Sequence, residues 1–175
     1  MIPISKVACL VLAVSLLSTV SAQRRRDPLN PNEADQLRDA AQEPAARLKL
    51  YIQFARTRLA SLEQARADLK APDRARQTHD RLQDFLDVYD EMNDNIDTFV
   101  ERKSDLRKPL KTIVEADTEF QAKLRALKSS LGASQEETSQ YDFVLTNVLD
   151  TIDSSSQDHR LLLKKQEEEG GPKKK

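Results

Sequence analysis

The stretch LQDFLDVYDEMNDNIDTFV, residues 82–100, decides how the rest of the chain is interpreted. Its large apolar residues recur at alternating steps of three and four, and most positions between them are acids or amides. This spacing places one apolar seam along one face of an α-helix. The seam consists of Leu82, Phe85, Tyr89, Met92, Ile96 and Phe99. Three interpretations are open: a seam that packs in the protein's own core, which we favour, a face that docks a partner, or a cofactor box.

The same rhythm continues beyond residue 100 and predicts a further long helix. It runs through Leu106, Leu110 and Ile113. Asp117 occupies the next seam position, and large apolar residues occupy the positions after it. Pro109 interrupts it, because proline removes a helical hydrogen bond and restrains the preceding residue. Two geometries follow, a hairpin between residues 104 and 109 or a single bent helix that keeps one seam. We favour a break or a sharp kink at Pro109, and the sequence does not decide between these two.

Prolines, glycines and polar caps mark the other helix ends. The segment Asn30-Pro31-Asn32-Glu33 predicts a capping box with a first-turn proline, and Pro44 ends or kinks the short helix that begins there. Ala71-Pro72 predicts a tight turn between two long helices. Gly132 is expected to end the third long helix, and Ser134 to cap the last one.

These elements define an all-α fold. We expect an elongated antiparallel helical bundle of three to four long helices with coiled-coil-like seams, preceded by a short N-terminal helix. The composition agrees, because 33% of the 175 residues are charged and only three are glycine. The expected divisions are a cleaved signal peptide over 1–22, an extended basic leader over 23–30, the helical bundle over 31–165 and a disordered charged tail over 166–175.

The first twenty-two residues predict export. Lys6 precedes an apolar run of about 14 residues, and Val20-Ser21-Ala22 is a small-residue cleavage pattern. The run is shorter than the roughly 20 residues that a membrane span needs, so no stable membrane insertion is expected after cleavage. Cys9, the one cysteine of the chain, lies in this segment, so the mature chain has no disulfide. The predicted location is periplasmic or extracellular.

The charge pattern predicts how the helices pair. The formal net charge is −1, which favours neither nucleic acid nor an anionic membrane as a partner. Residues 82–101 hold seven acids and no base, whereas the preceding helix is rich in bases. An antiparallel pair turning at Ala71-Pro72 would place Arg56 beside Asp87 and Lys49 beside Asp94. We therefore expect these two interhelical charge pairs.

Few residues of the sequence suggest chemistry. Met92 and His159 could ligate a haem in an exported bundle, but a seam methionine is usually a core residue, and His159 stands in a Ser/Gln/Asp-rich segment typical of a surface. His79, beside Asp80, is expected to face solvent. The acids of residues 87–97 lack the glycine and spacing of a calcium loop. No nucleophile motif or phosphate loop occurs. We predict no enzymatic activity, no catalytic residue, no cofactor, no metal and no small-molecule substrate.

Two functional classes remain. The first is a structural or protein-interaction role, as a scaffold or adaptor in the cell envelope, with a protein partner or a second copy docked on the bundle. The second is a holdase-like chaperone or binding module that shields apolar segments of client proteins. Seams that satisfy one another favour the first class, whereas an exposed apolar stripe favours the second.

Overall fold

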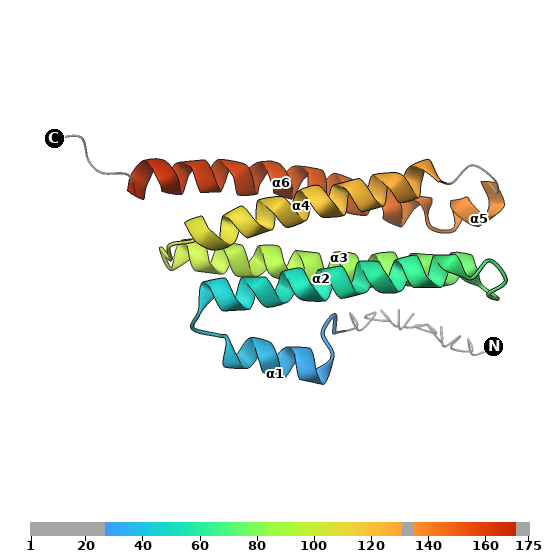
Figure 1. The fold of residues 1–175 in the computed structure, drawn as a ribbon, viewed down its shortest axis with the longest axis horizontal. Helices are drawn as coiled ribbons and strands as arrows, with labels where there is room; N and C mark the ends of the chain where they lie inside the picture. The colour runs from blue at the N-terminus through green and yellow to red at the C-terminus, as the bar shows by residue number, and fades with distance from the viewer. Residues whose placement is uncertain (1–26, 131–134, 171–175) are drawn as a thin grey trace, which may run out of the picture.

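A computed structural model describes residues 27–130 and 135–170, and over these residues the chain folds into six helices and no strand. Their bounds are α1 Pro31–Asp39, α2 Pro44–Ala67, α3 Arg74–Glu101, α4 Arg107–Ser129, α5 Gln135–Ser139 and α6 Asp142–Gly170. The four long helices, α2, α3, α4 and α6, lie side by side along the long axis of the molecule (Figure 1). The predicted all-α elongated bundle with a short N-terminal helix is confirmed.

Two helical hairpins make up the bundle. Helix α2 packs along α3, helix α4 packs along α6, and the hairpins meet through α2 with α4 and α3 with α6. Helix α1 lies on the outside against α2 (Figure 1). Each long helix therefore has two long neighbours and points one apolar face at a shared core.

Local sequence signals set the first two helix starts. The Asn30 side chain accepts a hydrogen bond from the Glu33 amide at 3.0 Å, and the Glu33 carboxylate accepts one from the Asn30 amide at 2.9 Å. These reciprocal bonds are the capping box that the sequence predicts, with Pro31 in the first turn. Helix α1 ends at Asp39, and α2 begins at Pro44.

Each of the two turns that join long helices directly lies next to a proline. Helix α3 ends at Glu101, and α4 begins at Arg107 with Pro109 in its first turn, where a missing amide costs little. Lys103 takes a left-handed backbone conformation, φ 57°, which reverses the chain between the two helices. The structure thus has a full break with hairpin geometry and not the single bent helix. Asp73 takes the same conformation in the α2–α3 turn beside Pro72.

The C-terminal third differs from the expectation in two ways. The last helical region is divided into the short α5 and the long α6, with a turn at residues 140–141. Helix α6 continues without interruption to Gly170, so residues 166–170 of the predicted disordered tail are helical. The signal peptide, the leader up to residue 26, the Gly132 and Ser134 caps and residues 171–175 lie outside the described residues.

The quoted seam lies in the core. Leu82, Phe85, Tyr89, Met92, Ile96 and Phe99 are each at most 4% exposed. Phe85 meets the ring of Phe120 from α4 edge to face, with the centroids 5.3 Å apart, and stacks on Tyr89 at 5.9 Å. Full burial of a large apolar side chain contributes about 1.5–3 kcal/mol, so this shared core provides most of the stability of the bundle.

Candidate functional site

A cluster of polar side chains lies inside the bundle, where three long helices meet. Asp117 of α4 has no exposed surface. Its Oδ1 accepts a hydrogen bond from the Tyr89 hydroxyl of α3 at 2.8 Å, and its Oδ2 lies 2.8 Å from Nδ1 of His159 of α6. Because a carboxylate accepts, the histidine ring donates to it. One carboxylate thus joins α3, α4 and α6; we call these three residues the buried triad.

The position of His159 corrects the sequence interpretation. The sequence predicted a surface residue, but His159 is only 4% exposed. The polar segment around it stays helical, and the spacing Ile152, Ser156, His159 continues the inward face of α6. A signal was present in α4, where Asp117 falls at a seam position, because a buried carboxylate requires donors nearby. The sequence could not say which helix supplies them.

Electrostatics keep the tyrosine of the triad neutral. Burial raises the pKa of the Tyr89 hydroxyl far above its ordinary value, and the nearby Asp117 carboxylate raises it further. A neutral phenol remains a donor, which the carboxylate needs. One helical turn away, the Asn93 side-chain amide donates to the Ser155 hydroxyl at 3.0 Å. Asn93 Oδ1 and Ser156 Oγ are buried and have no partner among the described atoms.

The buried triad does not line the cavities that lie at the end of the bundle where α3 turns into α4. Met92 lies packed in the α3 seam, and His159 directs Nδ1 at Asp117. Within residues 27–130 and 135–170, no group of three or more histidine, cysteine, aspartate or glutamate side chains could hold a metal ion. His79 is half exposed and contacts Asp80.

The two predicted charge pairs do not form. Arg56 donates to Glu119 of α4 at 2.8 and 2.9 Å rather than to Asp87, and no ion pair joins Lys49 to Asp94 within the described chain. The expected register is nearly right, because Asn95 of α3 bonds both Arg47 and Tyr51 of α2, at 2.6 and 2.9 Å. The error lies in the direction of the side chains. Arg56 is on the face of α2 that turns toward α4, which the register of α2 and α3 alone cannot reveal.

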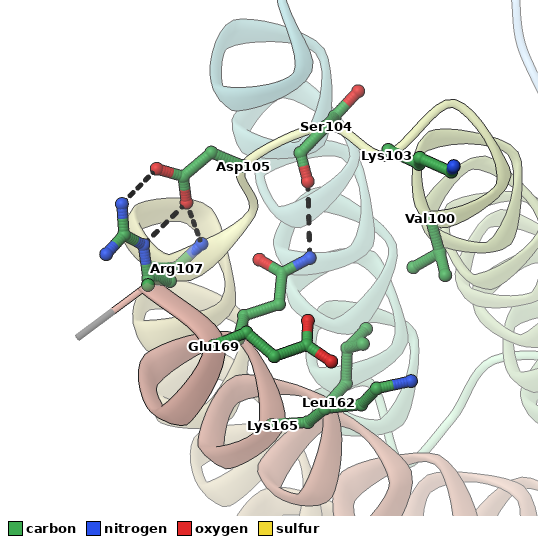
Figure 2. A pocket seen from close by; sticks show the side chains of 10 residues that line it. Val100, Lys103, Ser104, Asp105, Arg107, Leu162, Lys165 and Glu169 are labelled. Carbon is green, nitrogen blue, oxygen red and sulfur yellow. Dashed lines mark hydrogen bonds and ion pairs between the residues drawn. The ribbon is translucent and has the colours of Figure 1, made fainter. Parts of the chain in front are cut away.

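An open cavity of about 490 Å³ lies at the end of the bundle where α3 turns into α4 (Figure 2). Val100 and Leu162 contribute apolar surface, and Lys103, Lys165 and Glu169 stand around it. Gln166 of α6 donates to the Ser104 carbonyl at 3.2 Å and accepts from the Leu106 amide at 2.8 Å. These bonds hold the end of α6 against the hairpin and give the cavity a fixed wall.

Two more cavities continue the first around the end of the molecule. The second, about 770 Å³, shares Asp105, Arg107 and Gly170 with the first and extends to Ala45 of α2. The third, about 360 Å³, shares Ala45, Lys108 and Pro109 with the second and lies between the first turns of α2 and α4. We call the three together the hairpin-end furrow. Its basic residues are Lys49, Lys103, Arg107, Lys108, Lys111 and Lys165, and its acids are Asp105, Glu167 and Glu169.

Two acids of the furrow are already paired. Arg107 donates to Asp105 through Nε at 2.9 Å and through Nη2 at 2.5 Å (Figure 2). The hydrogen bonds from Arg107 lower the pKa of Asp105 to about 2. Lys111 lies 2.9 Å from Glu167. No ion pair engages Lys49, Lys103, Lys108 or Lys165 among the described residues, so the furrow is basic although the whole chain is close to neutral.

The sequence patterns considered above do not predict this furrow. Residues 101–111, ERKSDLRKPLK, carry five basic side chains in eleven residues, and that density was the available signal. It gained meaning only when folding brought Lys49 of α2 and Lys165 of α6 to the same end of the bundle.

Comparisons with protein-family models, with curated proteins and with solved structures find no match for this chain. Over the described residues, each helix is too short or too polar to cross a membrane.

Proposed function

We propose that this chain is an exported, non-enzymatic helical-bundle protein that serves as a scaffold or adaptor in the cell envelope. The observation that carries the proposal is the distribution of its surfaces. The seam residues are covered by the chain's own helices, whereas the furrow is open, fixed by hydrogen bonds and lined with unpaired lysines. An open basic surface of this kind can complement a partner of opposite charge.

The non-enzymatic part of the proposal is supported by the buried triad. Tyr89, Asp117 and His159 are residue types used in acid–base catalysis, but each is at least 96% buried. The Tyr89 hydroxyl, both carboxylate oxygens of Asp117 and Nδ1 of His159 are engaged with one another across three helices. Such an arrangement orients helices, and a reacting molecule would need space next to these atoms. The export part rests on the leader pattern of residues 1–22.

The holdase alternative is less well supported. Large exposed apolar side chains among the described residues are Leu69, Phe143 and Leu161. Phe143 and Leu161 are eighteen residues apart on α6, about 27 Å along the helix axis. Separate apolar side chains of this kind are ordinary on a protein surface, whereas a client-binding face needs a continuous patch.

The two roles are separated by a pair of measurements on the purified chain. A scaffold is expected to co-purify from the envelope fraction with one reproducible partner in a fixed ratio, measured by quantitative mass spectrometry of cross-linked complexes. A holdase is expected to suppress light scattering by a heat-aggregating client enzyme at stoichiometric amounts. Suppression of aggregation without any fixed-ratio complex would overturn the scaffold proposal.

A further inference from the structure

We propose that the hairpin-end furrow is a docking site for an extended acidic segment of a partner protein, with a large apolar side chain inserted between the first turns of α2 and α4. This inference rests on the proposed interaction role and names the chemistry of the partner. It is carried by the continuity of the furrow, by its charge and by its apolar floor.

The continuity of the furrow favours an extended ligand. Because neighbouring cavities share Asp105 and Arg107 at one junction and Ala45 and Lys108 at the other, the three cavities adjoin one another from the α3–α6 side to the α2–α4 side. A compact small molecule would fill only one of the three cavities. A peptide in extended form rises about 3.3 Å per residue and can follow the whole path.

The charge of the furrow selects an acidic ligand. Its lining holds twice as many basic as acidic side chains, and the acids Asp105 and Glu167 are already paired. Lys49 and Lys108 stand over the third cavity, where no acid is part of the lining. Lysines without an ion pair near an apolar surface attract carboxylates and raise the rate of encounter with an acidic partner.

The third cavity has the apolar lining that would receive the large apolar side chain of the partner segment. Its floor is made of Ala45, Ala46, Ile52 and Pro109, and Ile52 and Pro109 are buried. Small residues at the start of α2 leave a volume of about 360 Å³, at the lower end of the range of ligand pockets. A purely ionic ligand such as a phosphate would leave this floor unused, which is why a protein segment is favoured.

The charged segments that flank the described residues do not suit the furrow. Residues 23–26, Gln-Arg-Arg-Arg, and residues 171–175, Gly-Pro-Lys-Lys-Lys, carry the same sign of charge as the furrow. Like charges repel, so neither segment complements the lysines. The proposal therefore places the acidic segment on another molecule.

The test uses the purified full chain and three fluorescent twelve-residue peptides. The probe repeats Glu-Leu-Glu-Ser three times, one control replaces each glutamate by lysine, and the other replaces each leucine by serine. Fluorescence anisotropy is expected to show saturable binding of the probe that weakens as salt rises, no binding of the lysine peptide and clearly weaker binding of the serine peptide.

Charge reversal locates the site. The double variant Lys49→Glu/Lys108→Glu is expected to weaken probe binding at least tenfold. The matched control, Lys70→Glu/Lys128→Glu, makes the same change of net charge at the opposite end of the bundle, where both lysines are exposed, and should leave binding within twofold. Both variants should keep the helical circular dichroism of the parent chain.

Several outcomes would overturn the proposal. These are no binding of the probe, equal loss in both double variants, or tighter binding of vesicles containing phosphatidylglycerol or of polyphosphate than of the probe. If sedimentation shows a dimer of the parent chain, and Lys49→Glu/Lys108→Glu dissociates that dimer, the furrow binds a second copy of this chain and not an acidic partner segment. A fixed-ratio envelope partner that still binds this variant would refute the furrow site and leave the scaffold role intact.

Discussion

Asp117 is a carboxylate without exposed surface, in a seam whose other large members are apolar. Such a group is stable only when donors replace the water that it has lost. Tyr89 and His159 supply these donors from two other helices. A single residue thereby disfavours any packing of α3, α4 and α6 that would leave the carboxylate without donors.

Replacement of Asp117 by alanine should be strongly destabilising. It leaves the Tyr89 hydroxyl and the His159 ring buried without an acceptor, and we expect a loss of about 3–5 kcal/mol in the free energy of unfolding. Urea unfolding followed by circular dichroism measures this loss. The control is Asp158→Ala at an exposed position beside His159, which should change stability by less than about 0.5 kcal/mol. Similar midpoints for the two variants would show that the triad contributes nothing.

At the scale of the helix, the face on which a side chain lies, and not the register of the helix pair alone, decides which neighbouring helix it contacts. Arg56 lies at the expected height beside α3, yet its guanidinium bonds Glu119 of α4. Residues on one helix differ in direction by about 100° per step, so a residue can be level with one neighbour and point at another. The bundle has four long helices, and each surface residue has a choice of two neighbours.

A double-mutant cycle tests this pairing. Arg56→Glu should destabilise the bundle slightly, and Glu119→Arg in the same chain should restore stability, with a coupling of about 0.2–1 kcal/mol because the pair is partly exposed. Thermal or urea unfolding at low salt gives the four values. The parallel cycle of Arg56→Glu with Asp87→Arg should give no coupling. Coupling in the Asp87 cycle alone would restore the pairing first expected from the sequence.

At the scale of the whole molecule, α1 lies outside the core that the four long helices share. The four long helices share one core, whereas α1 packs against α2 only at the outside (Figure 1). Arg58 of α2 holds it by donating to the Glu33 carboxylate at 2.8 and 2.6 Å and to the Pro28 carbonyl at 2.9 Å. Burial raises the pKa of Glu33, but the hydrogen bonds from Arg58 and from the Asn30 backbone outweigh it, and the pKa is lowered.

This lowered pKa predicts that acid releases α1 first. The contribution of Glu33 is complete above its unfolded pKa, near 4.3, and is lost as the pH falls through the lower folded pKa. Hydrogen exchange at pH 3 compared with pH 6 should show lost protection in residues 31–39 while α3 and α4 stay protected, once intrinsic rates are corrected. In Glu33→Gln, which cannot titrate, the difference between the two pH values should disappear from α1. An unchanged pH effect in that variant would contradict the assignment to Glu33.

The sequence by itself determined the elements that depend on neighbouring residues. The capping box at Asn30, the start of α2 at Pro44, the disruption of the helix near Pro109 and the seam from Leu82 to Phe99 are encoded within a few residues of where they act, because hydrogen bonding and helical periodicity are local. The structure agrees with these predictions.

Only the tertiary structure decided which distant side chains meet. The burial of His159 against Asp117, the turn of Arg56 toward Glu119, and the gathering of Lys49, Lys108 and Lys165 at one end depend on how four helices are rotated against one another. Rotation is set by the total packing of the core, to which every seam contributes, so a single helix cannot reveal it. The furrow is invisible in the sequence for this reason, since its walls come from four helices far apart along the chain.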